Sequence, residues 1–119
     1  MRQFILDTLL PYKLNPETCA RDKTGCSYKM DDGRRCAVGK WLKDEYTSYH
    51  GSISKLLEDY KTTLNEVLVK EAVIQDIPLE VWKKMQLYHD KIELRTSCIN
   101  LVVSNLENLT GFKFPELYF

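Results

Sequence analysis

The sequence lacks any long hydrophobic run. No stretch approaches the about eighteen consecutive apolar residues that a membrane span needs. The N-terminal segment is apolar in part but reaches Asp7 and Pro11 too soon for a secretory signal peptide. Internal repeats and low-complexity segments are also missing. These absences predict a cytoplasmic protein that does not associate with a membrane.

An excess of charge of either sign is missing as well. The chain has 17 basic and 17 acidic residues and therefore no net charge. The two signs are interspersed between Arg21 and Glu45, so no strong field for a phosphate backbone is implied. Nucleic acid is not the expected partner.

Motifs that cradle phosphate are absent. The chain contains neither G-x-G-x-x-G nor G-x4-G-K-[ST], and Gly39-Lys40 lacks both the upstream glycine and the hydroxyl residue of a P-loop. Gly33 and Gly39 are therefore interpreted as positions that serve backbone geometry. The sequence predicts no cofactor.

Metal-binding spacing is also missing. The chain has two histidines and four cysteines, and none of the cysteines forms a C-x2-C pair. A cytosolic chain keeps its thiols reduced, and cysteine is among the most buried residue types. We therefore expect buried free thiols and no metal. The alternative is a zinc site made from the nearest possible ligands, Cys19, Cys26, Cys36 and His50.

What is present is enough apolar sequence for one core. The chain has 119 residues, of which 44% are hydrophobic, and this length predicts a single domain, 1–119. Apolar spacing and capping residues predict helices over 2–10, ended by Pro11, and over 16–20, 37–45, 53–60 and 63–75. A last, long helix is predicted from Pro78 to about Asn108, with an interruption of its apolar stripe at Arg95 and Thr96.

A β-hairpin is predicted over 26–38, centred on Asp31-Asp32-Gly33. Glycine supplies the positive φ that closes a three-residue loop. That loop sets Met30 opposite Arg34, Tyr28 opposite Cys36 and Cys26 opposite Val38, whereas a two-residue loop would turn Cys36 to the other side. The expected fold is mainly α with a small β-hairpin (α+β), with four or five helices. The long C-terminal helix would pack on the hairpin through Trp82, Met85 and His89.

Two sequence blocks carry a family resemblance. The first is C-x-Y-x4-G-x2-C-A-V-G, made by Cys26, Tyr28, Gly33, Cys36 and Gly39. The second is Met85-Gln86-Leu87-Tyr88-His89-Asp90, similar to an L-Q-x-x-H-D box. Together they resemble a family of small uncharacterised bacteriophage and bacterial proteins. The sequence departs from that pattern at Met85, where leucine is usual, and at Lys43, where proline often follows. The resemblance implies a shared fold and no established activity.

His89 and Asp90 are the most suggestive polar pair for chemistry. Neighbouring residues on a helix point about 100° apart, so Asp90 is not expected to orient His89. We interpret His89 as a core or rim residue that hydrogen-bonds to the hairpin. The catalytic alternative pairs Cys36 as a nucleophile with His89 as its base, assisted by Asp90 or Asp44.

The leading functional hypothesis is a small phage-type accessory protein that binds a protein partner, such as a host enzyme or defence factor, without catalysis of its own. The aromatic C-terminal tail either folds back on the helices or inserts into another molecule, and self-association is an option. The candidate contact residues are exposed aromatic, histidine and arginine positions: Arg34, Arg35, Tyr46, Tyr49, His50, Phe112, Phe114, Tyr118 and Phe119.

Two other classes of function stay open. One is a Cys/His or metal-dependent hydrolase built on Cys36 and His89. The other is a nucleotide or small-ligand binder with a pocket between the hairpin and the long helix.

Overall fold

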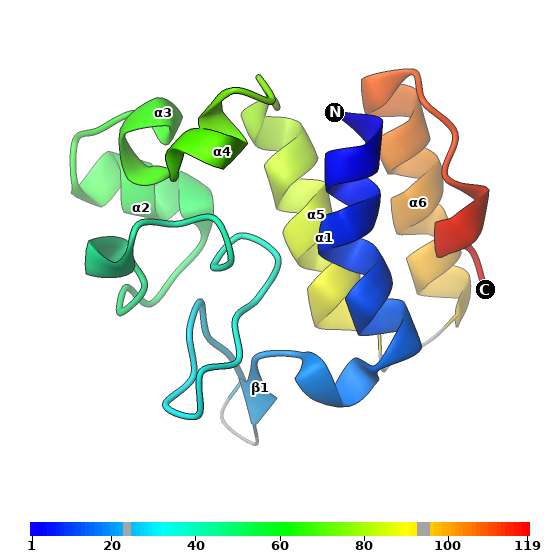
Figure 1. Ribbon diagram of the computed structural model, residues 1–119, viewed down its shortest axis with the longest axis horizontal. Helices are drawn as coiled ribbons and strands as arrows, with labels where there is room; N and C mark the ends of the chain where they lie inside the picture. The colour runs from blue at the N-terminus through cyan, green and yellow to red at the C-terminus, as the bar shows by residue number, and fades with distance from the viewer. Residues whose placement is uncertain (23–24, 93–95) are drawn as a thin grey trace.

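The computed structural model describes residues 1–22, 25–92 and 96–119, without the side chains of residues 21, 22, 25, 26 and 96. Six α-helices lie in these ranges (Figure 1). They are α1 (Arg2–Leu14), α2 (Ile53–Asp59), α3 (Leu64–Val67), α4 (Lys70–Val73), α5 (Leu79–Lys91) and α6 (Thr96–Thr110). Three 3-10 turns are η1 (Pro16–Thr18), η2 (Asp44–Tyr46) and η3 (Pro115–Leu117). None of the helices in the described ranges has the length and apolar character needed to cross a membrane.

Helices α1, α5 and α6 pack side by side, and α5 and α6 run in opposite directions (Figure 1). Each contributes apolar residues at three- and four-residue steps, which place them on one helical face. α2, α3 and α4 lie together beside this group. The largest fully buried side chains include Ile5, Leu9 and Tyr12 of α1, Trp82, Met85 and Tyr88 of α5, and Ile99 and Leu106 of α6.

The single long C-terminal helix is a wrong prediction. α5 ends at Lys91 and α6 begins at Thr96, while Arg95 lies outside the described residues. A continuous helix over 78–108 would be about 45 Å long at roughly 1.5 Å per residue. The longest extent of the molecule is 36 Å. Folding back lets both apolar stripes bury against each other, which a straight rod would leave exposed.

Pro11 does not end the first helix. α1 continues to Leu14, and the N–H of Asn15 donates to the carbonyl oxygen of Pro11 at 2.8 Å. An internal proline costs a helix about 3 kcal/mol. Contacts of the last turn offset that cost, because Tyr12 is buried and its hydroxyl donates to the carbonyl oxygen of Arg35 at 2.7 Å.

The β-hairpin and the α+β class are also wrong, because the fold is helical. β structure in the described residues consists of two two-residue strands, β1 (Arg21–Asp22) and β2 (Gly25–Cys26), and two isolated bridges. The turn at Gly33 has the three-residue register, since Met30 N–H donates to Arg34 O at 2.8 Å and Cys36 N–H to Tyr28 O at 3.2 Å. Between them Lys29 and Arg35 form a single bridge, so no ladder of strands follows.

The pairing does not continue to Val38, because the Val38 N–H donates to the side chain of Gln86 at 3.2 Å. Residues 37–41 form turns in place of the helix predicted over 37–45. The helix predicted over 63–75 is divided into α3 and α4, since Leu68 forms a bridge with Leu42. The helix predicted over 16–20 is the shorter η1. Between α3 and α4, backbone pairing with a distant segment replaces a local helical bond, because Val69 N–H donates to Trp41 O at 2.8 Å.

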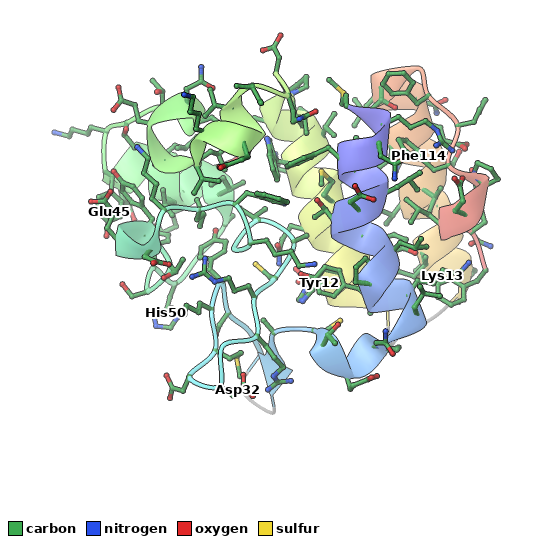
Figure 2. The ribbon with its side chains drawn as sticks, in the orientation of Figure 1. Tyr12, Lys13, Asp32, Glu45, His50 and Phe114 are labelled. Atoms are coloured by element: carbon green, nitrogen blue, oxygen red, sulfur yellow. The ribbon has the colours of Figure 1, made fainter. Side chains whose placement is uncertain are left out.

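The aromatic tail folds back, which was one of its two predicted options. Phe114 and Leu117 are fully buried, and Phe114 lies between α1 and α6 (Figure 2). The Arg2 guanidinium pairs with the Glu116 carboxylate at 2.8 Å and ties the tail to the start of α1.

Candidate functional site

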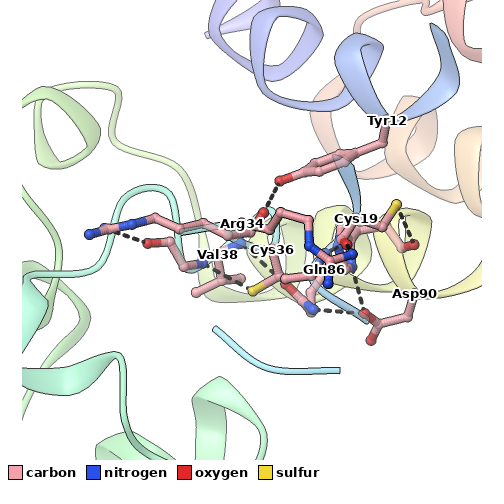
Figure 3. Close-up of polar contacts among 11 residues, drawn as sticks. Tyr12, Cys19, Arg34, Cys36, Val38, Gln86 and Asp90 are labelled. Atoms are coloured by element: carbon pink, nitrogen blue, oxygen red, sulfur yellow. Dashed lines mark hydrogen bonds and ion pairs between the residues drawn. The ribbon is translucent and has the colours of Figure 1, made fainter. Parts of the chain in front are cut away.

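The residues of the second sequence block form a hydrogen-bonded network on α5 (Figure 3). The Gln86 side chain accepts from Val38 N–H at 3.2 Å and donates to Asp90 Oδ1 at 2.8 Å. His89 Nδ1 lies 2.9 Å from the same Asp90 oxygen, and His89 Nε2 accepts from Ala20 N–H at 3.0 Å. The network therefore connects two distant backbone segments to one helix.

These contacts fix the tautomer of His89. Ala20 N–H can donate only to an unprotonated ring nitrogen, so the proton of the neutral imidazole is on Nδ1 and points to Asp90. Asp90 thus orients His89, contrary to the prediction. The helical angle of 100° separates Cα–Cβ directions, but a short carboxylate can still reach Nδ1, which lies close to its own backbone.

His89 is a core residue, as the structural interpretation predicted. It is fully buried, and Tyr12 packs edge-on against its ring at a centroid distance of 4.6 Å. Both ring nitrogens have partners, so neither is available to take a proton from Cys36.

Cys36 is also fully buried. Its sulfur accepts a hydrogen bond from Gly39 N–H at 3.2 Å. Burial raises the pKa of the Cys36 thiol to about 12, although the bond from Gly39 acts in the opposite direction. Because the thiolate is the reactive form, Cys36 is poorly suited to act as a nucleophile.

The glycine of the C-A-V-G segment is required by a close backbone approach. A Cβ atom on Gly39 would lie 1.9 Å from the carbonyl oxygen of Tyr28. Tyr28 is itself buried, and its hydroxyl donates to the carbonyl oxygen of Gly51 at 2.6 Å. Gly33 has a φ of 91°, as the predicted turn requires. The described residues of the first block therefore serve architecture, while the Cys26 side chain lies outside the described part.

The alternative zinc ligands are not brought together in the described part of the chain. No three of its His, Cys, Asp or Glu side chains are placed to share a metal ion. Cys36 is buried, whereas His50 is exposed at the edge of the molecule (Figure 2). Asp44, the other proposed catalytic helper, pairs with Arg35, and this contact lowers the pKa of Asp44.

Several residues that were predicted to contact a partner already form contacts within the fold. Arg34 donates to the carbonyl oxygen of Cys19 at 2.9 Å and pairs with Asp32 at 2.8 Å, and Arg35 bonds Gly39 O as well as Asp44. Tyr118 is half-buried and donates to Glu107 at 2.6 Å. Phe114 is buried, so its prediction as a free contact residue is wrong. Phe112 and Phe119 are exposed.

The loop that holds Tyr46, Tyr49 and His50 is fixed by its own contacts. The Tyr60 ring packs edge-on against both Tyr46 and Tyr49, at centroid distances of 5.3 and 5.8 Å. The Tyr49 hydroxyl bonds to Asp59, and the loop ends at Ser52, whose side chain caps α2. Desolvation and the Asp59 carboxylate raise the pKa of Tyr49 to about 12.

A pocket of about 450 Å³ lies between this loop and α5. Its lining includes Tyr28, Val38 and residues 49–53. α5 supplies Lys83, Gln86, Leu87 and Asp90. Among all the residues that line the pocket, Lys83, Leu87 and Ile53 were not predicted as site residues. The spacing of Lys83, Leu87 and Asp90, by four and three residues, was the available signal that they share a helical face.

No family model, curated protein or solved structure matches this chain.

Proposed function

We propose that this protein binds a small organic molecule in the pocket between residues 27–28, the 49–53 loop and α5. The supporting observation is the pocket itself. Its volume of about 450 Å³ lies within the range typical of small-molecule sites. The lining combines the apolar side chains of Val38, Ile53 and Leu87 with a few polar groups, among them Gln86 and Asp90.

Preorganisation supports the proposal. The loop is tied to Tyr28 by the bond from the Tyr28 hydroxyl to Gly51 O, and it is fixed at Tyr49 by Asp59. On the α5 side, Asp90 is oriented by bonds from Gln86 and His89. A ligand that enters such a site has little side-chain ordering to bring about, which favours affinity.

The catalytic alternative receives no support from this geometry. His89 uses both ring nitrogens in the fold, and Cys36 is buried and protonated at neutral pH. Binding of a protein partner, and the phage-type role that the resemblance implies, stay predictions. Among the aromatic tail residues, Phe112 and Phe119 are the two still exposed for such a contact.

A fragment library screened by two-dimensional NMR tests the proposal. We expect a subset of fragments to shift amide resonances of residues 49–53 and of α5. A ligand present at 100 times its Kd stabilises the fold by about 2.7 kcal/mol, so Tm should also rise. Leu87→Trp fills the pocket and should abolish these shifts. Leu101→Trp is the matched control, because Leu101 is 63% exposed on α6 and lies outside the pocket. Equal binding to both variants would contradict the proposal.

A further inference from the structure

The α5 side of the pocket carries opposite charges at its two ends. Lys83 and Asp90 are seven residues apart, with Leu87 between them, so all three lie along one face of the helix. Seven residues correspond to about 10 Å along the helix axis. Lys83 is 44% exposed and makes a 3.3 Å contact with Glu80, while Asp90 is 31% exposed. The pocket therefore offers an exposed cation two helical turns from a hydrogen-bonded carboxylate.

Two aromatic side chains, Tyr28 and Tyr49, line the pocket together with Val38 and Ile53. Aromatic side chains stack on any of the nucleobases, because every base has a π-face. His50, in the same loop as Tyr49, adds a further polar group.

From this arrangement we propose that the pocket takes a nucleoside monophosphate. The base packs on the pocket tyrosines with an N–H group donating to Asp90, since an ionised carboxylate only accepts hydrogen bonds. The phosphate lies at Lys83 and His50, where the Lys83 ammonium exchanges Glu80 for the phosphate. In a nucleoside monophosphate, the sugar separates the edge of the base from the phosphate. The length of the ligand is therefore comparable to the spacing between Lys83 and Asp90. A free amino acid carries its two charges too close together to reach both.

This inference rests on the proposed function, because it names the ligand class of the same pocket. The test is a titration of the protein with AMP, GMP, CMP and UMP, and with the four nucleosides and ribose 5-phosphate, followed by NMR amide shifts and calorimetry. We expect at least one monophosphate to shift pocket resonances. Its nucleoside and ribose 5-phosphate should each bind about tenfold more weakly or worse, because each lacks one charge-assisted or stacking contact.

Two charge variants locate the phosphate. Lys83→Gln should weaken the monophosphate about tenfold and leave the nucleoside unchanged. Lys91→Gln is the matched control, because Lys91 is exposed at the end of α5 and does not line the pocket. Asp90→Asn should weaken the nucleoside and the monophosphate alike. Its thermal unfolding is measured in parallel, since Asp90 also bonds Gln86 and His89.

The inference and the proposed function fail in different ways. If library fragments shift pocket resonances and no monophosphate does, the ligand class is wrong and the binding function stands. The ligand class is also wrong if a nucleoside binds as tightly as its monophosphate, or if Lys83→Gln and Lys91→Gln bind alike. If neither fragments nor nucleotides shift the pocket, both proposals are overturned.

Discussion

His89 accepts a hydrogen bond at Nε2 from the backbone N–H of Ala20, at a distance of 3.0 Å. The two residues are 69 positions apart in the chain, and the bond is buried. It joins the segment that follows α1 to the last turn of α5. His89 therefore connects two distant segments, and its loss should lower the free energy of unfolding.

His89→Ala should destabilise the fold by about 2 to 4 kcal/mol, because it leaves a cavity and an unpaired buried N–H at Ala20. Urea unfolding followed by tryptophan fluorescence measures this change. His50→Ala is the control, since His50 is exposed, and it should change the free energy of unfolding by less than about 0.5 kcal/mol. Equal stability of the two variants would refute the structural role of His89.

Gly39→Ala should destabilise the fold by about 3 kcal/mol. The added Cβ would meet the Tyr28 carbonyl oxygen at 1.9 Å, and backbone must move to relieve the clash. Gly111→Ala separates this clash from the cost of a positive φ, because Gly111 has φ 76° and open space around it. That control should cost about 1 to 2 kcal/mol. The prediction fails if Gly39→Ala is the milder change in chemical denaturation.

The two cysteines Cys36 and Cys98 should differ sharply in reactivity. Cys98 is exposed and Cys36 is buried with a pKa raised to about 12. A pKa raised by three units lowers the thiolate fraction at pH 8 about a thousandfold, and burial slows access further. Iodoacetamide labelling of native protein, read by peptide mass spectrometry, should modify Cys98 first. Comparable rates at both positions would revive Cys36 as a candidate nucleophile.

Two phenylalanines of the tail provide a matched pair for its packing. Phe114→Ala should lower the free energy of unfolding by about 3 to 5 kcal/mol, because Phe114 is fully buried. Phe119→Ala should change it by less than about 1 kcal/mol, since Phe119 is 51% exposed. Thermal or urea unfolding of the two variants measures the difference. A tail that does not pack on the helices would give two equally small effects.

The tail should loosen in acid through Glu107. The hydroxyl of Tyr118 and then the N–H of Phe114 stabilise its carboxylate, at 2.6 and 2.8 Å, and lower the pKa of Glu107 below its ordinary value of 4.5. A carboxyl group whose pKa is lower in the folded state contributes stability above its unfolded pKa and loses it as pH falls through the folded pKa. Glu107→Gln should therefore be less sensitive than the natural chain to a shift from pH 6 to pH 3. Amide exchange at Phe114 reports the loosening, and Glu71→Gln, an exposed position on α4, should retain the natural pH response.

Local sequence patterns were sufficient to predict the helical stripes. The apolar steps through Val81, Met85 and Tyr88, and those through Ile99, Val102 and Leu106, all fall on buried faces. Ser52 caps α2 through its side chain, which accepts from Lys55 N–H at 3.2 Å. The turn at Gly33 has its predicted register, because positive φ and loop length are local properties. The predicted hydrogen bond between His89 and the hairpin is wrong, because the backbone partner of His89 is Ala20.

Distant contacts decided the rest. Pro11 stays inside α1 because Tyr12 is held by His89 and Arg35, and the long C-terminal helix folds back because two apolar faces are buried better together than apart. The pocket also depends on this folding, since Tyr28, the 49–53 loop and α5 are brought together from three parts of the chain. The sequence by itself determined which faces are apolar and the turn at Gly33, because spacing and backbone preference act over a few residues. Only the tertiary structure decided which backbone groups the side chains of Gln86 and His89 would satisfy, because each buried polar atom takes whichever partner the packed core places within hydrogen-bonding distance.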